Sequence, residues 1–277
     1  MKKILILTTV ICMLLFSSCA SFHSTKRPIE ENSEGTDFSI ERISLEEYEF
    51  FSISDSMEGF ITNTERKDRI CFVRDFESHG DGTYHDIYLL LETTCELFKI
   101  TIKDRGCYAS SLYVCDIDGD SFDEIILQQT MGITGGNGQY LSRIFKINGS
   151  YIEELFHSDS FDTGYYSTFS DGFCLNIINR WTSEMHSIKY SERYVNLYFN
   201  NSGNVINHTD SILCDSFYSF EPIDIDQDGI FEISCIQYVS LNDHSDYIGD
   251  AQCILKYNPI EKQFKVVQSD FSPVDKN

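Results

Sequence analysis

The chain has 277 residues, of which 44 are acidic and 21 are lysine or arginine, so its formal net charge is −23. This charge excludes general nucleic-acid binding, which needs a basic face that displaces phosphate counterions, and it argues against a protein that lies flat on anionic lipid. Cations and basic partners are the natural counterparts of such a surface.

The N-terminal segment, from Met1 to Cys19, has the pattern of an export signal. Two lysines precede an almost wholly apolar, uncharged run over 4–16, which is too short to span a bilayer but fits the core of a signal peptide. The run leads into Phe16-Ser17-Ser18-Cys19, which resembles the lipobox of bacterial lipoproteins, with Phe16 where that family usually has Leu. The resemblance implies lipid on Cys19 and attachment to the extracytoplasmic face of a bacterial membrane. The alternative is an ordinary secretory signal cut near Ser18, with Cys19 incidental.

A polar segment separates this signal from the folded part of the chain. Residues 20–42 contain few hydrophobic side chains, which predicts a disordered tether. The folded domain is expected over 43–277. It opens with Ser44-Leu45-Glu46-Glu47, a capping-box sequence that predicts a short helix towards Phe51.

Beyond residue 55 the pattern predicts β-structure throughout. Short runs rich in Ile, Val, Tyr and Phe alternate with clusters of Asp, Asn and Gly, and no helical period of useful length competes with them. The predicted strands include 70–73, 86–91, 97–102, 124–127, 144–147, 194–199 and 254–257. The predicted fold class is therefore all-β.

The cysteines leave the redox state of the domain open. Eight of them follow Cys19, an even number that an exported chain could pair in disulfides. No C-x-x-C pair occurs, which disfavours a structural zinc site. Several, such as Cys115 and Cys235, lie in apolar strand-like runs, where a free thiol behaves as a small buried hydrophobe. We therefore expect mostly buried thiols.

An internal repeat is the clearest signal in the sequence. The segment 116–125, Asp-Ile-Asp-Gly-Asp-Ser-Phe-Asp-Glu-Ile, returns further along the chain as 224–233, Asp-Ile-Asp-Gln-Asp-Gly-Ile-Phe-Glu-Ile. Similar strands follow each copy, 144–148 in the first and 254–258 in the second. This predicts two diverged internal repeats of about 105 residues, over roughly 60–165 and 170–277.

The repeated segment has the ligand spacing of a calcium loop. Carboxylates at positions 1, 3, 5 and 9 and a backbone carbonyl at position 7 let a tight loop surround a hard cation with oxygens. The first loop offers Asp116, Asp118, Asp120, the Phe122 carbonyl and Glu124, and the second offers Asp224, Asp226, Asp228, the Ile230 carbonyl and Glu232. Gly229 suits the turn after the third Asp, whereas the first loop has Ser121 there. No Glu at position 12 and no flanking helices occur, which disfavours an EF-hand.

These residues carry a family resemblance. Asp-x-Asp-x-Asp-Gly-x-x-[Asp/Glu]-[Ile/Leu] leading directly into a strand resembles the FG-GAP and VCBS-type repeats of integrin-like β-propellers. The resemblance covers two segments of about forty residues, and it implies a β-propeller-like domain with structural, non-catalytic calcium between strands. The alternative is that both segments are solvated acidic turns, because Asp and Gly dominate β-turns for local reasons.

The function predicted from these features is a lipid-anchored, extracytoplasmic binding or scaffolding module with an unknown protein or glycan ligand, and not an enzyme. The alternative is a cell-surface hydrolase that acts on glycans, whose carboxylate pair the sequence does not single out. No Gly-x-Ser-x-Gly elbow supports a serine hydrolase. Trp181, the one tryptophan, is expected in the core, with an exposed partner contact as the second choice.

Overall fold

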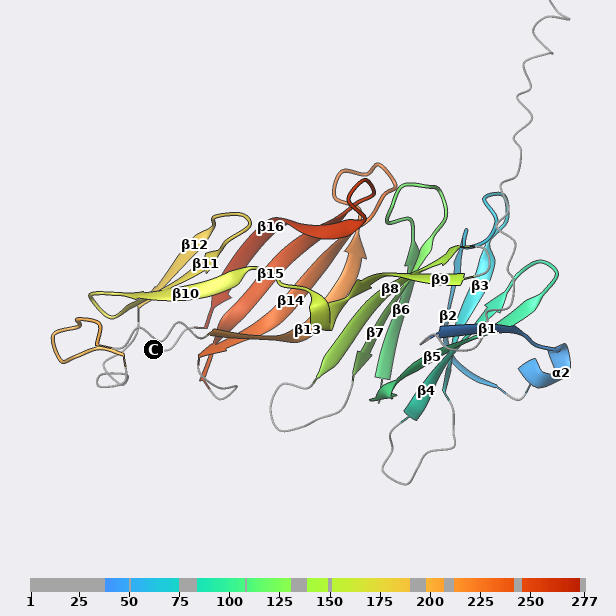
Figure 1. Ribbon diagram of the computed structural model, residues 1–277, viewed down its shortest axis with the longest axis horizontal. Helices are drawn as coiled ribbons and strands as arrows, with labels where there is room; N and C mark the ends of the chain where they lie inside the picture. The colour runs from blue at the N-terminus through green and yellow to red at the C-terminus, as the bar shows by residue number, and fades with distance from the viewer. Residues whose placement is uncertain are drawn as a thin grey trace, which may run out of the picture.

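Four antiparallel β-sheets make up the part of the chain that the structure describes, and they follow one another in a row (Figure 1). The computed structural model describes residues 38–49, 51–74, 84–107, 109–130, 139–148, 151–189, 198–206, 212–241 and 246–274. Within these residues, helix is confined to α2 and one 3-10 turn. The all-β class is confirmed, and the described sheets form an open row in which no ring closure is seen.

The N-terminal sheet has the strand order β1-β5-β4-β3-β2. Its elements are β1 (Phe38–Arg42), α2 (Leu45–Tyr48), β2 (Ser52–Gly59), β3 (Asp68–Arg74), β4 (Tyr84–Glu92) and β5 (Leu97–Cys107). The predicted capping box is confirmed, because the Ser44 backbone N–H donates to Glu47 Oε2 at 2.7 Å and the Glu47 N–H donates to Ser44 Oγ at 3.2 Å.

The other sheets are meanders of consecutive strands. The middle sheet contains β6 (Ala109–Cys115), β7 (Glu124–Thr130), β8 (Tyr140–Asn148) and β9 (Tyr151–His157), followed by the 3-10 turn η1 (Ser158–Ser160). The small sheet contains β10 (Tyr165–Ser170), β11 (Cys174–Asn179) and β12 (Met185–Lys189). The C-terminal sheet contains β13 (Ile212–Ile223), β14 (Glu232–Leu241), β15 (Asp246–Asn258) and β16 (Gln263–Pro273).

The middle sheet is buried on both faces, because successive side chains of a strand point to opposite sides. Ile125 and Leu127 of β7 belong to the core shared with the N-terminal sheet. Ile126, between them, belongs to the core shared with the C-terminal and small sheets. The row of sheets is therefore held together face to face by two hydrophobic cores.

Two expectations from the sequence need correction at the level of the fold. Residues 38–42 were included in the predicted tether, yet they form β1, which pairs with β5 and buries Ile40. Residues 20–37 lie outside the described part of the chain. Trp181 does not lie in the core: 56% of its surface is exposed, and its ring covers Gly164, where an added Cβ would lie 2.3 Å from the indole.

Most of the predicted strands and thiols occur as expected. Six of the seven predicted segments lie in β3, β4, β5, β7, β8 and β15, and the seventh, 194–199, falls largely outside the described residues. Among the described side chains, seven cysteines are free thiols, of which Cys71, Cys115, Cys235 and Cys253 are buried. Burial raises the pKa of the Cys71 thiol to about 11, so this thiol is a packing group rather than a nucleophile. Within the described residues, no helix has the length and apolar character needed to cross a bilayer.

Candidate metal site

The two acidic segments occupy the same place in two sheets of the same topology. The first acidic loop (residues 116–124) joins β6 to β7, and the second acidic loop (residues 224–232) joins β13 to β14. Each is therefore the first turn of a four-stranded meander, with eight residues between the strands, and its Glu opens the second strand.

The same hydrogen bonds shape both loops. The first Asp of each loop accepts the backbone N–H of position 6, from Ser121 to Asp116 at 2.9 Å and from Gly229 to Asp224 at 3.2 Å. The third Asp accepts the N–H of position 7, at 3.0 Å in the first loop and 2.8 Å in the second. Both loops take positive φ at positions 4 and 6, and each has one glycine there: Gly119 with Ser121, and Gln227 with Gly229.

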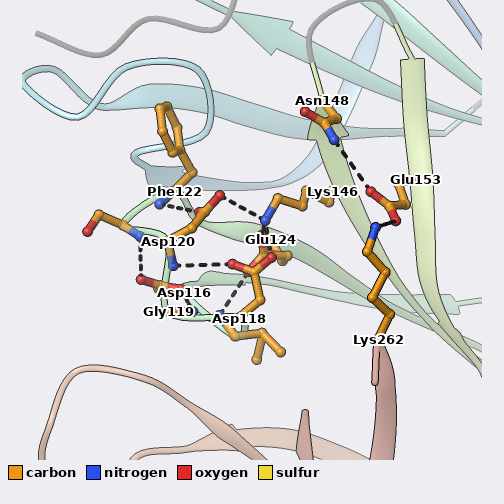
Figure 2. A network of polar contacts seen from close by, with 12 residues as sticks. Asp116, Asp118, Gly119, Asp120, Phe122, Glu124, Lys146, Asn148, Glu153 and Lys262 are labelled. Carbon is orange, nitrogen blue, oxygen red and sulfur yellow. Dashed lines mark hydrogen bonds and ion pairs between the residues drawn. The ribbon is translucent and has the colours of Figure 1, made fainter. Parts of the chain in front are cut away.

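The loops bring different carboxylates together. In the first loop, Asp116, Asp118 and Glu124 each offer an oxygen within 4.8 Å of the others (Figure 2). In the second, the corresponding group is Asp224, Asp226 and Asp228. Each loop thus gathers three of its four predicted acids. The Phe122 and Ile230 carbonyls remain predicted ligands, and the backbone N–H of each residue is bonded to the third Asp of its loop.

A lysine from the third strand reaches into each loop, and the sequence interpretation did not include it. Lys146 of β8 pairs with Asp118, lies 2.9 Å from Asp120 Oδ2 and lies 3.6 Å from Glu124 Oε1 (Figure 2). Lys256 of β15 pairs with Glu232 and lies 3.8 Å from Asp226 Oδ2. In each sheet, the first apolar residue after the Glu pairs with a residue of the third strand, and the lysine is the next residue along that strand. The two lysines therefore have equivalent positions.

The environments of the two lysines differ. The Lys146 side chain is 8% exposed, and burial works against its charge, yet hydrogen bonds to Asp118 and Asp120 raise its pKa. The Lys256 side chain is 44% exposed, and its hydrogen bond to Glu232 raises its pKa. Both lysines are therefore held in the charged form.

Glu124 is the most constrained acid of the site. It is fully buried; Oε2 accepts the Ile117 backbone N–H at 2.8 Å, while Oε1 accepts no hydrogen bond. Burial, with the nearby charge of Asp118, raises the pKa of Glu124 to about 8. A buried carboxylate oxygen that has no donor is an incomplete polar group. The Glu124 carboxylate belongs to the cluster with Asp116 and Asp118.

The two loops touch each other. The Phe231 backbone N–H of the second loop donates to the Asp116 carbonyl of the first at 2.8 Å. A Cβ added to Gly119 would lie 2.9 Å from Ile230 Cδ1, so the second loop also packs against the first through Ile230. A change in the shape of one loop would therefore alter its contacts with the other loop.

A third turn of the same kind precedes them, and the sequence interpretation missed it. Residues 60–67 join β2 to β3, again with eight residues, and Asp68, 2% exposed, opens the second strand as Glu124 and Glu232 do. The Asp123 N–H of the first loop donates to the Phe60 carbonyl at 3.0 Å, which repeats the contact between Phe231 and Asp116. Thr62 donates to Asp68 Oδ2 through its backbone N–H and its hydroxyl, both at 2.7 Å. This turn lacks the early acids, and the buried Asp68 carboxylate is satisfied by Thr62 without a cation.

Two sequence-level candidates lie outside what the structure describes. The predicted lipidation residue, Cys19, precedes the first described residue. The glycine-bearing segment 79–87 is similar to the acidic loops but lacks their early acids, and it is not counted as a third copy. Residues 79–83 lie outside the described residues, and residues 84–87 belong to β4.

Comparison with known proteins finds one family similarity and one relative. A family model described as the YybI C-terminal domain matches residues 163–272, from just before β10 into β16. The uncharacterized protein YybI of Bacillus subtilis (strain 168) is 22% identical over 210 residues, which is 73% of this chain and 79% of that protein. The family match includes the second acidic loop and begins after the first.

Proposed function

We propose that this chain is a lipid-anchored, extracytoplasmic binding or scaffolding module in which structural calcium occupies the two acidic loops. The observation that carries the proposal is the paired geometry of the loops: equivalent turns, the same hydrogen bonds, three clustered carboxylates in each, and direct contact between the two. Solvated turns of acidic composition have no reason to share this arrangement.

The donor set fits calcium. Carboxylate oxygens are its preferred ligands, and Oε1 of Glu124 in the first loop is a buried oxygen that accepts no hydrogen bond and has only the Lys146 ammonium, 3.6 Å away, as a positive neighbour. Lys146 supplies part of that charge, but Asp116, Asp118 and Asp120 against one ammonium still leave two negative charges, without counting Glu124, whose pKa is raised. Calcium would supply charge neutralisation there and fix the loop shape.

The architecture we propose is propeller-like, with internal repeats built on the acidic loops. Four-stranded meanders packed face to face support it, as do first turns that touch in succession, from residues 60–67 to the first loop and then to the second. Calcium in such turns would act on the junction between the sheets, which is a structural role and not a catalytic one.

Trp181 supports the proposed binding function. A large aromatic side chain that is 56% exposed is a frequent contact for partners, because it offers apolar area at small entropic cost. The ring is also held in place: its Nε1–H donates to the Asp162 carbonyl at 3.2 Å, and its face covers Gly164. A rigid exposed ring is suited to contact a protein or glycan.

Calcium should raise the melting temperature of the purified protein by a few degrees relative to chelator. Extracellular calcium modules bind at about 10⁻⁴–10⁻³ M, so free calcium at one to ten times the dissociation constant adds roughly 0.4–1.4 kcal/mol per site. Magnesium should act more weakly because it dehydrates reluctantly. Asp116→Ala and Asp226→Ala should each remove about half of the calcium-dependent part, measured by differential scanning calorimetry. Identical wild-type curves in calcium and chelator would reduce the loops to acidic turns.

The anchor has its own test. Replacing Cys19 by Ala in a bacterial host should release the protein from the membrane fraction or leave it unprocessed, because the acylated residue is lost. Labelled fatty acid should enter the wild-type chain only. A Cys19→Ala protein that is processed and still sediments with membranes would contradict the lipobox interpretation, and it would leave the calcium proposal standing.

A further inference from the structure

A second group of metal-ligating side chains lies between the small sheet and the C-terminal sheet, away from the acidic loops. Glu184 precedes β12, His186 lies in β12 and Asp270 lies in β16, and each offers a ligand atom within 4.8 Å of the others. Alternate residues of an extended strand share a face, so Glu184 and His186 point the same way. β12 and β16 are edge strands of their sheets, and the three side chains meet where these edges approach.

The histidine nitrogen is aimed between the two carboxylates. His186 Nε2 lies 3.3 Å from Glu184 Oε1 and 3.4 Å from Asp270 Oδ1. It is shielded from solvent, and neither oxygen is aligned to form a hydrogen bond with it. Donor atoms bound to a tetrahedral ion at about 2.0–2.1 Å lie about 3.3–3.4 Å from one another. The two separations from His186 Nε2 match those of ligands around a shared ion.

The charge of the cluster is also uncompensated. In the acidic loops a lysine stands among the carboxylates, whereas across the described ranges no lysine or arginine pairs with Glu184 or Asp270. When they act as metal ligands, two carboxylates and an imidazole bring two negative charges, which one divalent cation neutralises. The side chains of His186, Glu184 and Asp270 are 29%, 35% and 56% exposed, so the cluster lies at the protein surface, with its carboxylates partly exposed and Nε2 of His186 covered.

A supporting shell orients the glutamate. Ser269 Oγ donates to Glu184 Oε2 at 2.9 Å and itself contacts the Thr182 hydroxyl, which leaves Glu184 Oε1 directed at the histidine. The Tyr165 hydroxyl lies 2.7 Å from the Asp270 carbonyl oxygen and 2.9 Å from the Gln252 carbonyl oxygen and shares its one proton between them, which ties β10 to β15 and β16. Hydrogen bonds of this kind hold ligands in place before the metal arrives.

We propose that Glu184, His186 and Asp270 form a surface zinc site that links the small sheet to the C-terminal sheet, with water completing the coordination. One imidazole and two carboxylates are ligands that zinc accepts, and the shared geometry favours it over calcium, which takes oxygen ligands and a larger shell. The site is independent of the calcium proposal, because it uses other residues and another ion.

The test is zinc titration of the purified protein by calorimetry, with excess calcium present to occupy the acidic loops. We expect one zinc ion per chain. His186→Gln should lower the affinity by about a hundredfold or more, because a direct ligand is lost, and Ser269→Ala by about tenfold. His157→Gln, a histidine change on β9, is the matched control and should bind zinc as the wild type does.

A second measurement covers the folding of the variant. His186 lies on an exposed edge strand, so His186→Gln should keep the circular dichroism spectrum and the calcium-dependent melting of the wild type, while the rise in melting temperature on zinc addition disappears. A wild-type protein that binds no zinc would overturn the proposal, and so would a His186→Gln variant that is folded and binds zinc equally well.

Discussion

In chelator, Lys146→Met should lower the free energy of unfolding by about 3 kcal/mol, and saturating calcium should restore much of that loss. The ammonium lies among Asp118, Asp120 and the fully buried Glu124, and removing one partner of a buried ion pair typically costs about 3–5 kcal/mol because a charge is left uncompensated. Methionine keeps the length of the aliphatic chain, so the loss is mainly one of charge. Calcium in the loop would replace the missing positive charge.

Lys256→Met is the matched control. Lys256 has the equivalent position in the second loop, but its side chain is 44% exposed, so its ion pair is screened by solvent. The expected loss is about 1 kcal/mol or less. Chemical denaturation with and without calcium measures both variants. If Lys146→Met is equally destabilising in calcium and chelator, the lysine alone is the counterion of the first loop and the calcium proposal fails there.

The two acidic loops could be predicted because the residues that define each loop are contiguous in the sequence. A short turn between two strands, with acids at fixed positions, is written in one contiguous segment, and its repetition further along the chain identified the pair. The lysines were visible in the aligned strands 144–148 and 254–258, but a strand sequence does not show which carboxylate a side chain will face. That follows from the pairing of Ile125 with Phe145 and of Ile233 with Leu255, which only the register supplies.

The third turn shows how little signal a degenerate repeat leaves. Residues 60–67 have none of the early acids, so the spacing rule found nothing there. What remained was a single acid just before an apolar strand, Asp68 before Ile70, as Glu124 stands before Ile125. The predicted tether extends too far towards the C-terminus for a related reason. Phe38 and Ile40 alternate with Ser39 and Glu41, but this period-two pattern is too short to outweigh the polar composition around it.

The proposed zinc ligands could not be found in the sequence at all. Glu184 and His186 are close together, but Asp270 lies far along the chain from the histidine, in another sheet. Zinc sites are recognised in sequences by pairs of ligands at short spacing, mostly cysteine and histidine. A site assembled where the edges of two sheets meet has no such spacing. The sequence therefore could not predict this site, because its ligands come together only through the topology of the fold.

Phe156→Ala should lower the free energy of unfolding by about 3–5 kcal/mol, the usual cost of removing a buried aromatic side chain. Phe156 of β9 is 4% exposed. Its ring lies 5.1 Å from Phe220 of β13 and 5.2 Å from Phe264 of β16, between ring centroids. It is therefore a central contact between the middle sheet and the C-terminal sheet, the same two sheets whose acidic loops touch.

Phe156→Leu is the control, since leucine fills much of the space, and it should cost about 1 kcal/mol. Urea denaturation gives both values. The second loop contacts the first through Phe231 and Ile230. Looser docking of the two sheets in Phe156→Ala should therefore also weaken calcium binding, even though Phe156 is not one of the clustered carboxylates. A loss below about 1 kcal/mol for Phe156→Ala would mean that the two sheets are not docked through this cluster. Unchanged calcium affinity in a destabilised variant would mean that the loops hold their shape without it.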